Sequence, residues 1–436
     1  MPGQPRGLAS RLGRRRSDRR RGTMSKRTPG ATANRRPRRL GPRPLPLHLM
    51  NAIASWLGSL AAFPALKNGW PRSNPRLAAI AQELAAQLAA VAPEDFQAAL
   101  GRELRGQADA FLSGLQRYRH HPYCRPSEAR PVVWAEGTTR LLDYAPAGGI
   151  PLLVVPSLIN RFYILDLKPG RSLLSHLAAH GLRPLVVDWD RPGPAERGFG
   201  LTHYIAGRLD AAAEAALALT GRPLAVLGYC MGGLLALALA LRRQHEVSCL
   251  ALLATPWDFH AEQAAQARLL GTMSELLAAS WTELGEVPVD VLQSLFVALD
   301  PLLALRKFSR FAALDESSPE AEAFVALEDW LNDGVPLALP TARECLGGWY
   351  GANETASGAW TIAGSPVVPA RFTRPSLVVV PARDRIVPPG AAAALTPHLP
   401  RATQLSPPLG HIGMIAGGGA ERMWWPLTEW LLRHAA

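Results

Sequence analysis

Cysteine is scarce in this sequence, and its few copies stand far apart. The 436 residues contain four cysteines, none of which forms a Cys-x-x-Cys pair or a Cys/His ligand pattern. Neither a disulfide scaffold nor a zinc site is therefore indicated, and a reducing cytoplasm is the expected location. No Gly-rich P-loop is present to hold phosphates, and neither a metal nor a cofactor is expected.

Long apolar runs are also absent. The most apolar stretch, residues 45–66, is interrupted by prolines and polar residues and is too broken for a membrane span. Its apolar residues recur at helical spacing, which predicts an amphipathic helix. Packing of this helix on the body of the protein is favoured over adsorption to a membrane or granule surface.

Acidic residues are almost missing from the first 44 positions. That segment holds fifteen Lys and Arg against the single acid Asp18, whereas the rest of the chain is two charges negative. The segment also has almost no apolar residues to bury. Residues 1–44 are therefore predicted to be a disordered basic tail, and no specific nucleic-acid partner is expected. The tail is either native or a non-native extension ahead of a translation start at Met24; a transit peptide is a less favoured alternative.

The remaining sequence is that of a large globular protein, with 48% hydrophobic residues overall and no internal repeat. Residues 45–120 are predicted to form a helical N-terminal region, in which Pro93 begins a second helix after a break. From residue 121 onward, short apolar runs alternate with helical patterns. The runs lie at residues 131–134, 139–144, 151–155, 183–188, 222–227, 247–254 and 375–380. An α/β fold with a mostly parallel sheet is therefore predicted over residues 121–436, with a helical cap, in which no clear strand run is visible, inserted between two strands at about 259–369.

A nucleophile pattern follows one buried strand. The run Leu224 to Leu227 leads into Gly228-Tyr229-Cys230-Met231-Gly232-Gly233 and then into a helical run. This order of strand, sharp turn and helix is the nucleophile elbow of α/β-hydrolases, with cysteine in place of serine. Cys230 is the predicted nucleophile, and the amide of Met231 is the predicted oxyanion donor at the helix N-terminus. Cys249 and Cys345 are interpreted as core residues.

An acid and a histidine follow in the order that such an elbow requires. Asp384 comes after the run 375–380, at the end of a strand, and His411 stands in a short loop before the terminal helix. The alternatives are a turn-forming aspartate and a surface or capping histidine. The second oxyanion donor is predicted to be the backbone of Leu158, in the loop after the strand at 151–155.

These motifs together resemble the polyhydroxyalkanoate (PHA) synthases, a family of the α/β-hydrolase superfamily with a Gly-x-Cys-x-Gly-Gly signature. Residues 156–167, 187–190 and 349–350 resemble further family motifs, and the likeness covers about 118–434. The resemblance implies an acyltransferase that polymerises (R)-3-hydroxyacyl-CoA into a polyester and releases CoA. Cys230 would carry the acyl group, His411 would be the general base and Asp384 would orient it. The chain length is nearer to the short type of synthase.

The resemblance also implies partners and a location. It predicts association with the polyester granule surface in the cytoplasm, and either a homodimer or a second synthase subunit. The chain departs from many members in having Leu409-Gly410 before His411 and Arg385 after Asp384, which bears on substrate preference. Cysteine suits the chemistry because a thiolate exchanges one thioester for another, and the acyl-enzyme stays activated for attack by a hydroxyl group.

Three other functions stay open at this point. The first is a thioesterase or polyester hydrolase on the same scaffold, which the cysteine disfavours because esterases of this fold mostly use serine. The second is an inactive, granule-associated scaffold protein, which would not need an intact Cys, Asp and His set. Nucleic-acid binding through the basic tail is the weakest of the three.

Overall fold

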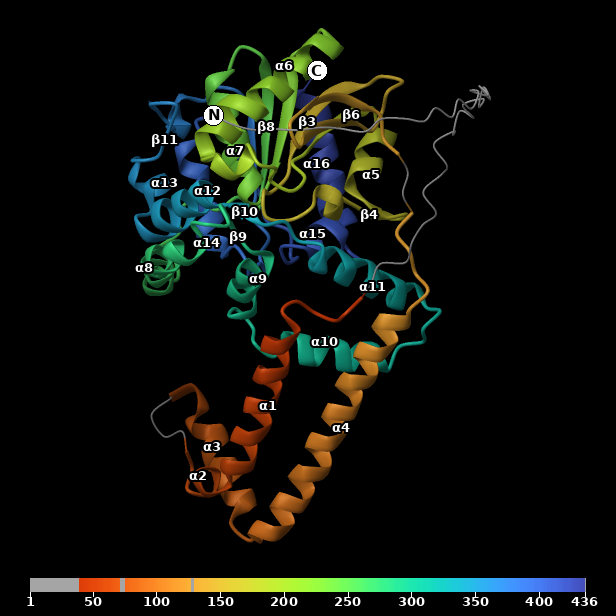
Figure 1. Cartoon of the computed structure of the whole chain (residues 1–436), viewed down its shortest axis with the longest axis vertical. Helices are drawn as coiled ribbons and strands as arrows, with labels where there is room; N and C mark the ends of the chain where they lie inside the picture. The colour runs from red at the N-terminus through yellow and green to blue at the C-terminus, as the bar shows by residue number, and fades with distance from the viewer. Residues whose placement is uncertain (1–38, 71–74, 127–128, 436) are drawn as a thin grey trace, which may run out of the picture. The chain divides into compact units, whose positions relative to one another are not determined.

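An eight-stranded sheet forms the centre of the computed structural model, which describes residues 39–70, 75–126 and 129–435 (Figure 1). The strands are β1 (Val132–Glu136), β2 (Thr139–Asp143), β3 (Ile150–Val155), β6 (Leu182–Asp188), β7 (Leu224–Tyr229), β8 (Val247–Leu253), β13 (Ser376–Val379) and β14 (Ala402–Leu405). Their order is β1-β2-β6-β3-β7-β8-β13-β14. All neighbours from β6 to β14 are parallel, and β2 is antiparallel to both β1 and β6. The predicted mostly parallel sheet is confirmed.

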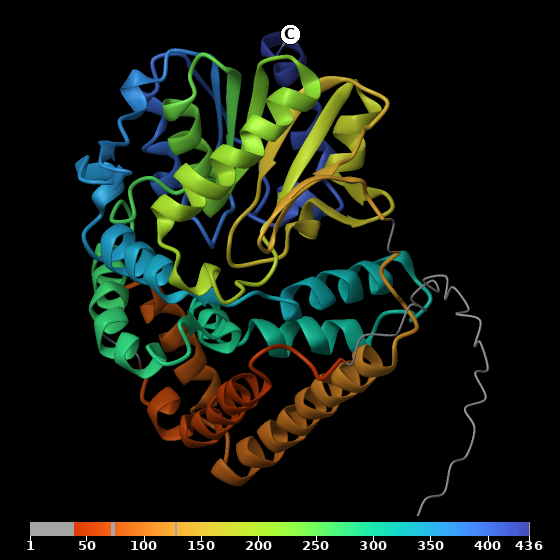
Figure 2. The same ribbon diagram turned by 45° about the horizontal axis from the view of Figure 1, so that its top comes forward.

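Helices cover both faces of this sheet (Figure 2). Alternate residues of β3 point to opposite faces: Leu153 and Val155 belong to one core, and Leu152 and Val154 to the other. The first core includes α6 (Asp210–Thr220) and α7 (Met231–Arg242), and the second includes α5 (Leu173–Ala179) and α16 (Glu421–His434). Burial on both faces explains why the parallel strands are continuous apolar runs.

The cap lies between β8 and β13 and is mainly helical. Its helices are α8 (Ala264–Trp281), α9 (Val289–Val297), α10 (Leu303–Ala312), α11 (Pro319–Asn332), α12 (Leu339–Arg343), the π-helix η4 (Glu344–Gly351) and α13 (Glu354–Ser357). The predicted helical cap is present, and it also contains strands that the sequence did not indicate. Two short antiparallel pairs are present, β9 (Glu286–Val287) with β10 (Leu337–Ala338) and β11 (Thr361–Ile362) with β12 (Ser365–Pro366). Strands of two residues are too short to leave a periodic pattern.

Smaller elements connect these layers. They are the strands β4 (Asp166–Lys168) and β5 (Arg171–Ser172), the π-helix η3 (His203–Leu209), the helices α14 (Pro389–Ala393) and α15 (Gly413–Ala416), and the 3-10 helices η1 (Phe162–Leu165), η2 (Glu196–Gly198), η5 (Pro369–Arg371) and η6 (Thr396–His398). Within the described residues, no helix is both long and apolar enough to span a membrane.

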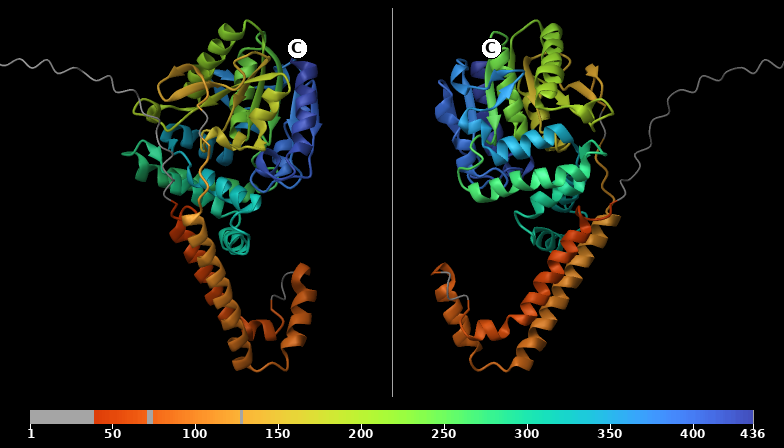
Figure 3. Two further views of the ribbon diagram at one scale, coloured as in Figure 1. Left: turned by 90° about the vertical axis from the view of Figure 1, so that its right-hand side faces the viewer. Right: turned by 60° about the vertical axis from the view of Figure 1, so that its left-hand side comes forward.

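Residues 45–120 are helical throughout their length apart from short breaks and residues 71–74, which are not described. They form α1 (Leu45–Ala61), α2 (Phe63–Lys67), α3 (Pro75–Leu88) and α4 (Pro93–His120). Figure 3 shows α1 and α4 side by side. The buried end of α4 packs on the cap: Phe111 and Tyr118 make edge contacts with Phe308 of α10, with ring centroids 6.2 and 5.6 Å apart. The cap thus rests on the N-terminal helices as well as on the sheet.

The apolar side of α1 is only partly covered. Met50 and Leu57 are 64% and 61% exposed, and Ile53 and Leu60 are also exposed. The expectation that this helix packs its apolar face on the body is therefore wrong for these four side chains. We refer to Met50, Ile53, Leu57 and Leu60 as the α1 apolar face. A face of this kind on a protein surface is typical of an interaction site.

One arginine at the start of the described chain is tightly held. Arg39 is buried and its guanidinium donates two hydrogen bonds to the carboxylate of Asp329, both 2.6 Å long. It also donates to the carbonyl oxygens of His121 and Tyr123, each at 2.7 Å. The packed part of the chain therefore begins before the predicted boundary at residue 44. The predicted tail up to residue 38 lies outside the described residues.

Candidate active site

Cys230 stands at the turn between β7 and α7, at the carboxyl edge of the sheet. Its backbone has φ 57° and ψ −128°, a conformation that costs energy for a residue other than glycine. The amide of Cys230 donates to the carbonyl oxygen of Leu253 at 2.8 Å, and its own carbonyl accepts from Gly233 at 2.9 Å. These bonds hold the strained turn in place. The side chain is partly exposed and lines a cavity.

Two glycines of the motif are required by close packing. A Cβ atom on Gly232 would lie 2.2 Å from the carbonyl oxygen of Val155, and one on Gly233 would lie 1.8 Å from Oγ1 of Thr255. The first turn of α7 therefore touches the end of β3 on one side and the end of β8 on the other. This packing explains the additional glycine in Gly-x-Cys-x-Gly-Gly.

His411 and Asp384 form a buried pair, each 6% exposed. Nδ1 of His411 lies 2.7 Å from Oδ2 of Asp384. The other carboxylate oxygen, Oδ1, accepts the backbone N–H groups of Ile386 and Val387 at 2.8 and 2.9 Å. Asp384 lies in the loop after β13, and His411 in the loop before α15. The carboxylate is thus fixed by its own loop and in turn orients the imidazole ring.

The charges around His411 favour its protonated form. Burial by itself lowers the pKa of His411, but the negative charge of the Cys230 thiolate and hydrogen bonds to Asp384 and Cys230 raise it to about 10. An imidazolium next to the sulfur stabilises a thiolate, which is the reactive form of cysteine. The structure therefore brings the three predicted residues Cys230, Asp384 and His411 into one interacting group.

Sequence reasoning missed the support that Tyr229 gives to this group. Its hydroxyl donates to the carbonyl oxygen of His411 at 3.3 Å, and its ring centroid lies 5.1 Å from that of the imidazole. Burial raises the pKa of Tyr229, so the phenol stays protonated as a donor. Tyr229 is a variable position within the elbow pattern, and only its place next to Cys230 could have drawn attention to it.

Both predicted oxyanion donors lie at the edge that carries Cys230. Met231 is the first residue of α7, where backbone N–H groups have no partner within the helix. Leu158 lies in the loop after β3, and β3 pairs in parallel with β7, with Val155 opposite Gly228. The close contact of Gly232 with Val155 and Pro156 brings this loop against the elbow. The arrangement is suited to binding an oxyanion next to the sulfur.

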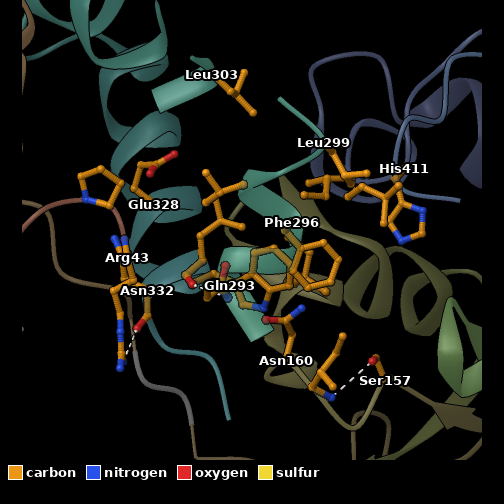
Figure 4. Close-up of a pocket in the computed structure, with 18 of the residues that line it drawn as sticks. Arg43, Ser157, Asn160, Gln293, Phe296, Leu299, Leu303, Glu328, Asn332 and His411 are labelled. Carbon is orange, nitrogen blue, oxygen red and sulfur yellow. Dashed lines mark hydrogen bonds between the residues drawn. The ribbon is translucent and has the colours of Figure 1, made fainter. Parts of the chain in front are cut away.

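Two cavities meet at Cys230. The larger, which we call the catalytic cavity, has a volume of about 300 Å³ and extends to α1, α10 and α11 (Figure 4). The smaller has a volume of about 200 Å³ and extends under the cap, where Trp349 and Tyr350 line it. Ile159, Phe296, Leu299, Arg385 and Ile386 line both. Both linings are mostly apolar, which favours an acyl ligand over a strongly hydrated one.

Other titratable side chains have structural roles. Cys249 and Cys345 are buried, in β8 and in the cap respectively. His121 lies within hydrogen-bonding distance of the carbonyl oxygen of Glu316, and His260 of that of Tyr350. Within the described part of the chain, no group of three or more His, Cys, Asp or Glu side chains is arranged to hold a metal ion.

This geometry defines a class of protein, and comparison with known proteins defines a family within it. The family model described as alpha/beta hydrolase fold matches residues 150–417. The chain is 30% identical to the poly(3-hydroxyalkanoate) polymerase subunit PhaC of Synechocystis sp., over 74% of this chain and 90% of that protein. It is 28% identical to PhaC of Haloferax mediterranei, over 70% of this chain and 64% of that protein. The chain belongs to the alpha/beta hydrolase family and, within it, to the PhaC family of poly(3-hydroxyalkanoate) polymerases.

Proposed function

We propose that this protein is a PHA synthase that polymerises (R)-3-hydroxyacyl-CoA and releases CoA, through an acyl-enzyme on Cys230. The observation that carries the proposal is a cysteine on a strained elbow next to a buried, hydrogen-bonded His411–Asp384 pair, in a chain of the PhaC family. A Cys-His-Asp triad of this kind supports acyl transfer.

In the first half of the reaction, the Cys230 thiolate attacks the thioester carbonyl of the substrate. The oxyanion that forms accepts hydrogen bonds from the backbone amides of Met231 and Leu158. The intermediate collapses with cleavage of the bond to the CoA sulfur, which takes a proton from His411. The product is an acyl thioester on Cys230 and free CoA. One thioester replaces another, so the step costs little free energy.

In the second half, a hydroxyl group of a further hydroxyacyl unit attacks the Cys230 thioester. His411 accepts the hydroxyl proton, the new ester bond forms, and the Cys230 thiolate leaves. Forming an oxygen ester from a thioester is favourable, which is the reason that cysteine suits the reaction better than serine. Asp384 holds the imidazole in the orientation that both proton transfers require.

Whether water can reach the acyl-enzyme decides between polymerisation and hydrolysis. The cavities at Cys230 are lined mainly by apolar side chains of the cap, among them Phe296, Leu299 and Trp349. Such a lining disfavours an attacking water molecule and leaves room for an acyl chain. The runner-up function is a thioesterase or polyester hydrolase, which would use the same triad with water as the acceptor.

A single incubation distinguishes these functions. The purified protein is mixed with (R)-3-hydroxybutyryl-CoA, free thiol is followed with time, and the product is recovered. The proposal predicts thiol release together with polyester. Free hydroxy acid would identify a hydrolase, and the absence of thiol release would support an inactive scaffold protein.

The α1 apolar face supports the proposed association with polyester granules. Its four exposed side chains lie on a helix without Asp, Glu, Lys or Arg. A helix of this kind adsorbs to an apolar surface because the contact removes its apolar side chains from water. The α1 apolar face is also available to a second copy or a second synthase subunit, which are the proposed protein partners.

A further inference from the structure

The end of the catalytic cavity farthest from the triad contains buried polar atoms that have no partner among the described residues. Figure 4 shows Glu328 and Arg43 on the side of the cavity opposite to His411, with Phe296 and Gln293 between them. Besides Arg43, the polar groups at this end include His48 on α1, which lies next to the Arg43 carbonyl oxygen, and the paired Lys307 on α10 and Glu328 on α11. None of them has a role in the proposed chemistry. We call His48, Lys307 and Glu328 the distal polar cluster.

His48 presents a hydrogen-bond acceptor to the cavity. It is 9% exposed, and its Nε2 lies 3.3 Å from the carbonyl oxygen of Arg43, so Nε2 carries the hydrogen of the neutral ring. Burial lowers the pKa of His48, and the charge of Lys307 lowers it further, which keeps the ring neutral. Nδ1 is therefore an acceptor, and within the described residues this buried atom has no partner.

Glu328 presents a second acceptor. The side chain is 2% exposed and its Oε1 is bonded to the Lys307 ammonium at 2.7 Å. The other oxygen, Oε2, is buried and has no partner among the described residues. Nearer the triad, Oδ1 of Asn160 lines the same cavity and is likewise buried without a partner there. An unsatisfied buried acceptor is energetically unfavourable, so a ligand that supplies donors gains binding energy from each of these atoms.

The chemistry of the missing donors identifies the ligand class. Three separated acceptors along a mainly apolar cavity match an elongated, uncharged ligand with N–H and O–H groups spaced along it. The pantetheine arm of an acyl-CoA has this character, with two amide N–H groups and one hydroxyl group joined by short apolar segments. An acyl chain has no such donors beyond its 3-hydroxyl group.

We propose that the catalytic cavity holds the pantetheine arm of the substrate, and that His48 and Glu328 accept hydrogen bonds from it at the distal end. Lys307 acts as a positioning residue that holds the Glu328 carboxylate. The inference rests on the proposed function, because it takes an acyl-CoA to be the substrate. It also assigns α1 a part in substrate binding, since His48 is contributed by that helix.

Truncated thioesters test this assignment. The 3-hydroxybutyryl thioester of pantetheine carries the whole arm, whereas the thioester of N-acetylcysteamine carries one amide next to the sulfur and ends before the distal end. For His48→Leu and Glu328→Gln, we expect kcat/KM with the pantetheine thioester to fall about tenfold through a higher KM, as for the loss of one buried hydrogen bond. With the N-acetylcysteamine thioester, kcat/KM should stay within about twofold of the wild-type value.

A matched control is available in His176, whose Nε2 is also a buried atom without a partner among the described residues but which does not line the catalytic cavity. His176→Leu should leave kcat/KM unchanged with both thioesters. Equal losses with both thioesters in the His48 and Glu328 variants, or no loss with either, would overturn the assignment.

A binding measurement separates this inference from the proposed function. Calorimetric titration of Cys230→Ala protein with pantetheine does not depend on turnover, and adding His48→Leu should weaken binding about tenfold. If wild-type protein releases no thiol from any thioester but this weakening is seen, the proposed function fails and the subsite stands. If thiol is released but pantetheine binds equally well with and without His48→Leu, the subsite fails and the function stands.

Discussion

The elbow around Cys230 and the N-terminal helices are stabilised in different ways. At the elbow, the contacts are between backbone atoms. Gly232 packs against the end of β3, and the amide of Cys230 donates a hydrogen bond to the end of β8. The N-terminal helices are attached by side chains instead, through the bidentate Arg39–Asp329 pair and aromatic contacts on Phe308. They also leave the α1 apolar face uncovered.

This difference corresponds to two kinds of task. Acyl transfer needs the sulfur, the imidazole and the oxyanion donors within fractions of an ångström, which close backbone packing provides. Surface adsorption needs exposed apolar area and little geometric precision. Substitutions at the elbow should therefore change the chemistry steeply, and substitutions in the N-terminal region should affect local stability and surface binding instead.

The largest effect is expected at Cys230. Cys230→Ala should lower the rate of CoA release by a factor of about 10⁴ or more, because no other group can form the acyl-enzyme. Thiol release from 3-hydroxybutyryl-CoA measures this. Cys124→Ala, at a partly exposed cysteine outside the site, is the matched control and should keep wild-type activity. Substantial turnover by Cys230→Ala would refute the assignment of the nucleophile.

Asp384→Asn should reduce the rate about 10²- to 10⁴-fold, because the imidazole loses its orienting charge. Thiol release from 3-hydroxybutyryl-CoA measures this rate. In the wild type the pKa of His411 is raised to about 10, so the imidazolium is lost only as the pH rises through about 10.

In the Asp384→Asn protein, His411 should lose its proton at a lower pH, because Asp384 contributes to the raised pKa, and NMR titration of the imidazole measures this. The raised pKa also has a consequence for stability. The stabilisation from protonated His411 is fully present below its ordinary pKa of 6.5 and is lost as the pH rises through about 10. A pH-independent stability difference between wild type and His411→Ala from pH 6 to 10 would contradict this assignment.

Arg39→Ala should weaken the attachment of the N-terminal helices by about 3–5 kcal/mol, because it leaves the partly buried Asp329 carboxylate and two carbonyl groups without their donor. Urea unfolding followed by circular dichroism should show this as an earlier loss of part of the helical signal. If the N-terminal helices are attached independently of the elbow, protection of amides in α1 and α4 should decrease in hydrogen exchange, while that of β7 and α7 stays unchanged. Equal loss in both regions would contradict the proposed difference between them.

A pair of glycines compares the two regions directly. Gly232→Ala should cost about 3 kcal/mol of unfolding free energy, since its Cβ would lie 2.2 Å from a backbone oxygen that cannot move away. Gly58→Ala, in the interior of α1 with nothing within 4 Å, should instead stabilise by about 0.5–1 kcal/mol. Thermal unfolding should therefore show a lower melting temperature for Gly232→Ala and a higher one for Gly58→Ala. If Gly58→Ala lowered the unfolding free energy as much as Gly232→Ala, the proposed difference between the elbow and the N-terminal helices would be contradicted.

The smallest effect on the fold is expected on the α1 apolar face. Leu57→Asp should change the unfolding free energy by no more than about 0.5 kcal/mol, because the side chain is 61% exposed. It should nevertheless lower the fraction of protein that sediments with polyester particles. Gln97→Asp, at an exposed position of α4, adds the same charge away from that face and should leave sedimentation unchanged. Equal sedimentation of the two variants would argue against α1 as the contact.

Much of the sheet could be predicted from sequence because parallel strands buried on both faces are continuous apolar runs. The strand β14 was missed for the same reason, since Ala402–Leu405 lies at the sheet edge with exposed residues and has no apolar run. The order of the strands and the pairing of β2 with β6 depend on tertiary contacts that no local pattern records.

The triad candidates could be predicted because each follows a recognisable strand or precedes a recognisable helix. The distal polar cluster could not, because His48 on α1 is far in the sequence from Lys307 on α10 and Glu328 on α11. The α1 apolar face was misjudged because helical spacing shows that a face is apolar but not what covers it.

The most direct test of the account is whether an acyl group is attached to Cys230. Butyryl-CoA lacks the 3-hydroxyl group that would continue the chain, so it should leave a stable acyl-enzyme. After incubation and acid quenching, peptide mass spectrometry should find one butyryl group on Cys230 of the wild-type protein and none on Cys230→Ala protein. A butyryl group on another residue, or CoA release without any acylated Cys230, would contradict the account.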